Sequence, residues 1–351
     1  IKRAAPPLTP QQRQLLRTLA RRTWLFYVQF VGPEDNWLPP DHFQESPNGA
    51  VAHRTSPTNV GLYLLSALAA HDLGYLSTGT FALRIDFAFA ALDRQERYRG
   101  HFLNWIDTIT LQPLLPRYVS TVDSGNLAAC LIALKHGLQE LPQQQVWDQE
   151  RSEGVADTFA LLVEALAPLE SLVDEDQRVL WRLLAEQQER IATTPATPGA
   201  WEALLAHLAG EERRRLEPLI ASVADSAGSA LDTETLRSLR IYSSRAFQYF
   251  ERVQRELEAN LPWLTYLPAA PALLAGPDAP QELAARWNAL VQALPGNPLW
   301  ADIPGVCSDA LAQLAAIREQ LAPPPQHSDN AADAASTDTL YDAIGYCERF
   351  A

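Results

Sequence analysis

The sequence contains no methionine and only three cysteines, and it begins at Ile1. Because a natural start would be methionine, we expect this chain to be a piece of a longer polypeptide. The cysteines are odd in number, lie far apart and form no CxxC pair, which is not the pattern of a disulfide framework or a zinc site. We therefore expect buried free thiols at Cys130, Cys307 and Cys347.

Basic residues are scarce, since 28 lysines and arginines stand against 42 aspartates and glutamates and give a formal net charge of -14. A nucleic-acid partner requires a basic surface that matches the phosphate backbone, so none is expected. No window approaches the roughly 20 apolar residues of a membrane-spanning helix. No basic segment followed by an apolar one has the form of a signal peptide. We expect a soluble chain with no membrane span of its own.

Motifs for cofactors and metals are also missing. The sequence has no P-loop and no G-x-G-x-x-G fingerprint, which argues against a phosphate-cradling nucleotide site. It has no G-x-S-x-G elbow for a serine nucleophile. His42, His53 and His101 lie in different loops and match no metal-ligand spacing such as HExxH. We expect neither a cofactor nor a bound metal.

Hydrophobic residues make up 47% of the chain and recur at helical spacing along most of it. Thr9 and Ser56 each precede a proline and predict helix starts, and Gly74 predicts a helix end. Asp123 or Ser124 is expected to cap the fourth helix. No window alternates like a strand, so the prediction is an all-α fold of about a dozen helices joined by long, aromatic-rich loops. The expected helices cover residues 10–30, 57–74, 78–97, 124–136, 154–167, 174–191, 198–209, 211–224, 232–261, 281–294, 304–321 and 338–350.

Four clusters of polar and aromatic residues interrupt the helical pattern between residues 36 and 126. Sugar rings stack on aromatic side chains and their hydroxyls need fixed polar partners, so such clusters are typical of a carbohydrate site. The clusters read Asn36-Trp-Leu-Pro-Pro-Asp-His-Phe-Gln44, His53-Arg-Thr-Ser-Pro-Thr-Asn59, Gly100-His-Phe-Leu-Asn-Trp-Ile-Asp-Thr108 and Tyr118-Val-Ser-Thr-Val-Asp-Ser-Gly-Asn126. The candidate substrate-binding residues are Trp37, Asp41, Gln44, Arg54, Asn59, His101, Trp105, Asp107, Tyr118 and Asp123.

Each candidate also has a purely structural interpretation. Asp123 suits a helix cap, and Asp41 and Asp107 suit turns that a carboxylate organises. The aromatic residues could pack in the core, and Arg54 could hold loop carbonyls. Glycosidic chemistry needs two carboxylates that flank the bond. The clusters offer Asp41, Glu45, Asp107 and Asp123, with the choice of pair left open.

The same clusters resemble the central region of cyclic β-1,2-glucan synthases, which are large bacterial membrane proteins. The resemblance implies that an N-terminal membrane glycosyltransferase elongates a β-1,2-glucan from UDP-glucose. It further implies that a helical, glycoamylase-like (α/α)-barrel region cyclises the glucan by transglycosylation, and that a phosphorylase-like region trims it. The matching fragments are Asn36 to Gln44, Arg54-Thr-Ser-Pro-Thr-Asn-Val-Gly-Leu62, Asp72-Leu-Gly-Tyr75, Tyr98-Arg-Gly-His-Phe-Leu-Asn-Trp-Ile-Asp-Thr108, Pro116-Arg-Tyr-Val-Ser-Thr-Val-Asp-Ser-Gly-Asn-Leu127 and Gly154-Val-Ala-Asp-Thr158.

By this resemblance the chain is the front part of the central region, related to or part of an (α/α) barrel. It is expected to contribute to glucan binding and to be inactive alone, because the residues expected to catalyse cyclisation lie beyond Ala351. His42 and Ile106 stand where the family pattern has Asn and Tyr, and no catalytic role is assigned to any residue. The expected partners are a β-1,2-glucan chain and the flanking domains of the parent polypeptide, with this region on the cytoplasmic side of the bacterial inner membrane.

Four segments are predicted: a motif-bearing segment at 1–138, an amphipathic helical segment at 139–322, a linker at 323–336 and a terminal helix at 337–351. The alternative function is a non-catalytic helical scaffold or interaction domain that orients flanking enzymatic regions. Geometry separates the two hypotheses, because binding predicts that the key residues converge on one open cleft and a scaffold predicts dispersal or burial. Those residues are Trp37, Asp41, Arg54, Trp105, Asp107 and Asp123.

Overall fold

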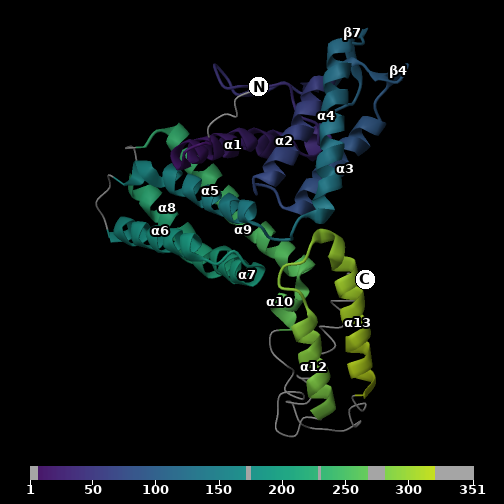
Figure 1. The fold of residues 1–351 in the computed structure, drawn as a ribbon. Helices are drawn as coiled ribbons and strands as arrows, with labels where there is room; N and C mark the ends of the chain where they lie inside the picture. The colour runs from purple at the N-terminus through teal and green to yellow at the C-terminus, as the bar shows by residue number, and fades with distance from the viewer. Residues whose placement is uncertain (1–6, 171–174, 228–230, 268–280, 321–351) are drawn as a thin grey trace, which may run out of the picture. The chain divides into compact units, whose positions relative to one another are not determined.

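The computed structural model describes residues 7–170, 175–227, 231–267 and 281–320 (Figure 1). The chain divides into two compact units. The first unit comprises residues 1–140, 149–193 and 213–248, and the second comprises 141–148, 194–212 and 249–351. Helices make up most of both units, which confirms the all-α prediction, while the relation to an (α/α) barrel stays a prediction. The predicted segments 323–336 and 337–351, and Cys347 with them, lie outside the described residues.

The first unit is built around helix α2, which packs against α1, α3 and α4. Figure 1 shows α2 and α4 side by side. Helix α5 packs against α1 and α6, and α6 packs against α8. Fully buried side chains such as Tyr63, Phe81 and Phe159 fill the space between these helices. The helical elements are α1 (Pro10–Phe30), η1 (Pro33–Asp35), α2 (Pro57–Asp72), α3 (Thr78–Asp93), α4 (Thr121–Glu140), α5 (Gln149–Leu166), η3 (Ala167–Leu169), α6 (Glu175–Thr193), α8 (Arg213–Ala227) and the first part of α9 (Thr233–Asn260).

The helix starts follow the capping signals with one exception. Thr9 Oγ1 accepts the backbone N–H of Gln12 at 3.2 Å, and the Gln12 side chain accepts the N–H of Thr9 at 2.9 Å, which completes a capping box. Ser56 caps α2 as predicted. The prediction that Asp123 or Ser124 caps α4 is wrong. Ser120 accepts the N–H of Asp123 at 3.1 Å, and the helix begins at Thr121.

Helix α2 ends where the chain passes α5 at very close range. Gly74 has a φ of 78°, a left-handed conformation that suits glycine, as predicted for the helix end. A Cβ atom built on Gly154 would lie 2.2 Å from the carbonyl oxygen of Gly74. Beside this contact, the Tyr75 hydroxyl hydrogen-bonds to Asp157 at 3.0 Å, and Arg17 pairs with the same carboxylate at 2.7 Å. The contact therefore fixes α2 against both α1 and α5.

The polar clusters contain a small antiparallel sheet and two hairpins. The sequence analysis predicted no strands, so it was wrong here. The sheet has the order β3-β6-β7, with Arg54 opposite Asp107 and Asn104 opposite Tyr118. These strands are too short to show an alternating pattern, and the prolines of β7 are tolerated because β7 is an edge strand. The strands are β1 (Phe43–Gln44), β2 (Ala50–Val51), β3 (Arg54–Thr55), β4 (Arg97–Tyr98), β5 (His101–Phe102), β6 (Asn104–Asp107) and β7 (Pro113–Tyr118).

Helix α3 is shorter than predicted, because the chain leaves the helix at Asp93 and forms the β4–β5 hairpin. Arg99 and Gly100 turn this hairpin with φ values of 50° and 87°. Helical periodicity continues a few residues past the true end of α3, so the pattern alone overextends the helix.

The second unit is helical, and its core contains two tryptophans. The rings of Trp147 and Trp201 lie 5.4 Å apart, and the Asn297 side chain accepts from and donates to the backbone of Trp147 at 3.1 and 2.7 Å. Helix α12 packs against α13. Cys307 is buried here, as Cys130 is in the first unit, which confirms the prediction for both thiols. The elements are η2 (Leu141–Gln143), α7 (Pro198–His207), the π-helical turn η4 (Leu208–Glu212), the end of α9, α10 (Pro262–Tyr266), α12 (Gln281–Ala293), η6 (Trp300–Asp302) and α13 (Ile303–Gln320).

Candidate functional site

The first turn of α2 contacts two of the candidate carboxylates. The Asn59 amide donates to Asp41 Oδ1 at 3.2 Å, and Ser56 and Thr58 lie close enough to Asp123 to lower the pKa of its carboxyl. The N-terminus of a helix favours nearby negative charge, which adds to these hydrogen bonds. A single rigid turn therefore holds both Asp41 and Asp123.

The Asp41 group consists of Asp41, His42, Arg54, Asn59 and Trp105. Asp41 Oδ2 accepts from the Nη2 and Nε atoms of Arg54 at 3.0 and 3.3 Å, and it lies 3.1 Å from His42 Nδ1. The Arg54 guanidinium lies 5.2 Å from the centroid of the Trp105 ring. Partial burial opposes ionisation of Asp41, but hydrogen bonds from Asn59, Arg54 and His42 outweigh it and lower the pKa of this carboxyl. The result is a fixed guanidinium beside a half-buried indole.

The Asp123 group consists of Ser56, Thr58, Asn104, Ser120 and Asp123. The Asn104 amide donates to Asp123 Oδ2 at 3.1 Å, and Asn104 is itself buried. Burial opposes ionisation of Asp123, yet its side-chain hydrogen bonds, led by that of Ser120, lower the pKa of the carboxyl. Asn104 contacts Asp123 and Trp105 lies beside Arg54, so β6 contributes one residue to each of the two groups.

Further polar side chains continue from the Asp123 group along the start of α4. The exposed His101 places its Nδ1 atom 3.1 Å from Ser124 Oγ. The Asn126 amide donates to Thr58 Oγ1 at 3.1 Å. Of the predicted residues, Asp41, Arg54, Asn59 and Trp105 thus come together in one group. Asp123, at the start of α4, contacts the same first turn of α2, and His101 contacts the neighbouring Ser124.

Three other predicted residues have no side-chain bond to these groups, although Asp107 and Tyr118 are the strand partners of Arg54 and Asn104. Asp107 Oδ1 accepts from the backbone N–H and the hydroxyl of Thr110 at 2.7 and 3.0 Å, so it organises the turn between β6 and β7. Gln44 is exposed and donates to the carbonyl of Ser46 at 2.8 Å. Tyr118 is 43% exposed on the edge strand β7. None of the hydrogen bonds of Asp107 and Gln44 given above involves Asp41 or Asp123.

Trp37 belongs to a separate part of the first unit. Its ring stacks on Phe87 with centroids 4.9 Å apart and an interplanar angle of 26°. The loop is anchored by Asn36, whose amide donates to the carbonyl of Thr108 at 2.8 Å and whose carbonyl accepts from Arg94 at 2.6 Å. Trp37 lines a cavity of 440 Å³ that the sequence did not indicate.

Several residues of the two groups were not predicted from the sequence. Asn104 lies within a recognised cluster, and its place directly before Trp105 was an available signal. Thr58 directly precedes the predicted Asn59 in the capped first turn of α2. Ser56 and Ser120 were hidden because a residue that caps a helix gives no sign that its hydroxyl also serves a neighbouring carboxylate.

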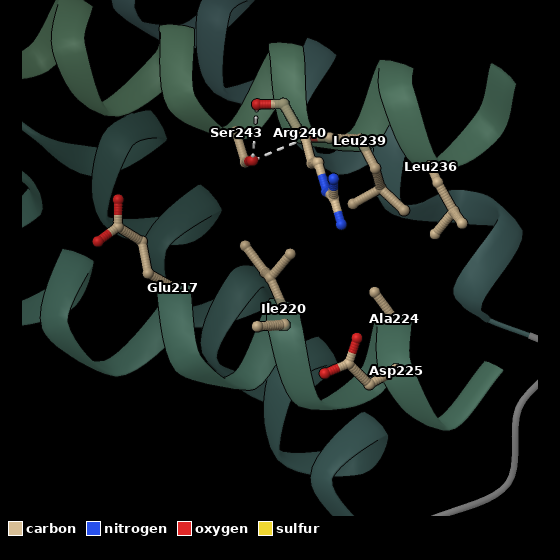
Figure 2. Close-up of a pocket in the computed structure, with 9 residues that line it drawn as sticks. Glu217, Ile220, Ala224, Asp225, Leu236, Leu239, Arg240 and Ser243 are labelled. Atoms are coloured by element: carbon tan, nitrogen blue, oxygen red, sulfur yellow. Dashed lines mark hydrogen bonds between the residues drawn. The ribbon is translucent and has the colours of Figure 1, made fainter. Parts of the chain in front are cut away.

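A groove of 320 Å³ lies between α8 and α9, away from the polar clusters in sequence. Figure 2 shows Ile220 and Ala224 of α8 facing Leu236 and Leu239 of α9, with the Arg240 guanidinium pointing into the space between the two helices. No predicted site residue lines this groove.

Within the described residues, no three His, Cys, Asp or Glu side chains are placed to hold a metal ion. No helix in that part of the chain is long and apolar enough to cross a membrane.

Comparison with known proteins finds a relative whose sequence aligns with half of this chain. The chain is 43% identical over 180 residues to the protein named cyclic beta-(1,2)-glucan synthase NdvB of Rhizobium meliloti (strain 1021). This match covers 50% of the chain and 6% of that protein. A scan against models of known protein families finds no match. The resemblance that the motifs predict is confirmed over this stretch, and the chain spans only a small part of its relative.

Proposed function

We propose that this chain is part of a cyclic β-1,2-glucan synthase and that its polar loops bind the glucan chain. The Asp41 group is the observation that carries the proposal. It combines a half-buried indole with a guanidinium whose position is set by two hydrogen bonds to one carboxylate. The 43% identity to a cyclic glucan synthase supports the choice of a β-1,2-glucan as the ligand.

Sugar binding needs an apolar surface beside rigid polar groups. The ring of Trp105 supplies the apolar surface, and Arg54 has five N–H donors, of which two point to Asp41. Asp41 accepts from Asn59 as well, so its carboxylate holds Arg54 rather than competing for the sugar. A ligand hydroxyl that meets this arrangement finds donors already in place, which reduces the entropic cost of binding.

The same geometry argues that neither Asp41 nor Asp123 is the general acid of a glycosidic reaction. Protonation of a leaving glycosidic oxygen requires a carboxyl group with a raised pKa. The pKa values of Asp41 and Asp123 are both lowered by their hydrogen bonds, so both are ionised at neutral pH. The ionised carboxylate of Asp41 instead holds Arg54 in place, which supports a role in glucan binding. The membrane location and the full synthase activity belong to the proposed parent protein.

The second candidate function is a helical scaffold that orients flanking enzymatic regions. Two observations favour it: Trp37 and Asp107 do not converge on Asp41, and the Asp41 carboxylate already accepts from three side chains. On this hypothesis the polar clusters only tie loops to helices. The two hypotheses differ in whether Trp105 has a ligand.

Calorimetric titration of linear β-1,2-glucan into the full chain tests the proposal. We expect measurable heat for the wild type and an affinity at least about tenfold lower for Trp105→Ala, a loss of about 1.4 kcal/mol. Trp181→Ala is the matched control, because Trp181 is also half-buried but lies on α6, outside the polar clusters. Absence of heat with millimolar glucan and a folded protein would refute glucan binding and favour the scaffold.

A further inference from the structure

The cavity beside Trp37 is distinct from the Asp41 and Asp123 groups. It has a volume of 440 Å³, within the roughly 300–1,000 Å³ of small-molecule sites. The end of α1, the following loop and the side chains of Val51, His53 and Arg84 line it. His53 and Arg54 are consecutive residues, but His53 lines the cavity and Arg54 contacts Asp41.

Arg84 gives this cavity a buried positive charge with few acceptors. The residue is 7% exposed, and its guanidinium lies 5.6 and 5.8 Å from the ring centroids of Trp24 and Trp37. Its hydrogen bond goes to the Tyr63 hydroxyl at 3.4 Å, and no carboxylate of the described residues pairs with it. No Arg84 nitrogen is among the fully buried atoms without a partner, so the donors that Tyr63 does not use can meet acceptor oxygens in the cavity. A ligand in the cavity would supply those oxygens.

His53 supplies a positioned acceptor on the same cavity. Its Nδ1 atom lies 2.8 Å from Oδ1 of Asp35, which is 6% exposed and also accepts from the Thr108 hydroxyl. Because the carboxylate accepts, Nδ1 carries the hydrogen, and in the neutral ring Nε2 is the acceptor. Nε2 has no partner among the described residues, and the side chain is 43% exposed. It is therefore free to accept a hydrogen bond from a ligand hydroxyl.

The charge of the lining favours a neutral ligand. Glu34 and Asp35 both line the cavity and would repel an anion, although Arg84 alone would attract one. Phe30, Val31 and Trp37 add apolar walls. We propose that this cavity binds one neutral hexose unit, whose hydroxyls accept from Arg84 and donate to His53. This inference rests on the proposed function only for the choice of a sugar, because the donor, the acceptor and the cavity are observed independently.

The experiment uses the full chain and two ligands, free glucose and linear β-1,2-glucan. Glucose is titrated by saturation-transfer NMR and calorimetry into the wild type, His53→Phe and His53→Gln. We expect millimolar binding to the wild type, at least tenfold weaker binding to His53→Phe, and partial recovery with His53→Gln, whose amide oxygen still accepts. His136→Phe is the matched control, because His136 is exposed on α4 and lines no cavity described here. Thermal unfolding of each variant establishes that it is folded.

The outcomes separate this inference from the proposed function. Absence of glucose binding, equal affinity in His53→Phe, or inorganic phosphate binding in place of glucose would each overturn the hexose site, even where glucan still binds through Trp105. Conversely, glucose binding that depends on His53, together with no heat from glucan, would support the cavity and refute the proposed function. If His53→Phe does not fold, the comparison of His53→Gln with the wild type and the phosphate titration still decide the question.

Discussion

Gly154→Ala is expected to destabilise the first unit, because α5 meets the turn after α2 at backbone contact distance. A Cβ at residue 154 would lie 2.2 Å from the carbonyl oxygen of Gly74 and 2.5 Å from its carbonyl carbon. Both are backbone atoms, so no side-chain rotation relieves the overlap. Overpacking costs about 1–3 kcal/mol, and a clash this far inside van der Waals contact is expected at the upper end. Since alanine gains about 1 kcal/mol over glycine within a helix, the net loss is about 2 kcal/mol.

The loss is measured as the shift in the urea unfolding midpoint, followed by circular dichroism. About 2 kcal/mol corresponds to roughly a thirtyfold change in the ratio of folded to unfolded protein. Gly125→Ala is the matched control, because Gly125 also lies in a helix but a Cβ there meets nothing within 4 Å. That variant should be more stable than the wild type by about 0.5–1 kcal/mol. Equal midpoints for Gly154→Ala and the wild type would refute the close-contact argument.

Two further predictions concern charged groups. The folded-state pKa of Asp41 lies below its unfolded value of 3.8, so its stabilising contribution is complete above that pH and is lost as pH falls through the folded value. Asp41→Asn should therefore lower the midpoint of thermal unfolding at about pH 7. The difference between the midpoints of the variant and the wild type should narrow below pH 3.8. An equal difference at about pH 7 and below pH 3.8 would contradict this. Arg17→Met removes the cationic partner of Asp157, which is 5% exposed and keeps only neutral donors such as the Tyr75 hydroxyl, and should cost about 3 kcal/mol in urea unfolding. Adding Asp157→Asn should recover part of that loss, and no recovery would show that the ion pair is not its source.

Local signals in the sequence predicted the helices well, because each signal acts within a few residues. Thr9 and Ser56 cap the helices that they were expected to cap, and Gly74 has the left-handed conformation expected at a helix end. The prediction that Asp123 caps α4 was wrong because its side chain makes a contact that is distant in the sequence. Its carboxylate is directed to Asn104, a contact across 19 residues that no local rule includes.

The sequence identified several residues of the candidate site, but it did not predict which of them lie together. Arg54, Asn59 and Trp105 do meet at Asp41, but Trp37, from the same cluster as Asp41, lies on a different cavity. Contacts between residues far apart in the sequence decide this division: Asn36 anchors the loop of Trp37 to Thr108 and Arg94, whereas Arg54 and Asn59 hold Asp41. Local rules do not include such contacts, so the sequence alone could not separate the two sites.

Helix α2 explains why fragments far from the polar clusters share the family resemblance. Its 16 residues span about 24 Å, and its two ends have different neighbours. One end is fixed by the contact of Gly74 with Gly154 and by the hydrogen bond from Tyr75 to Asp157. The other end carries Asn59, which holds Asp41. Because a helix keeps its two ends in fixed relation, the resembling fragments at 72–75 and 154–158 act through packing: they set the position of the turn on which the polar groups are built.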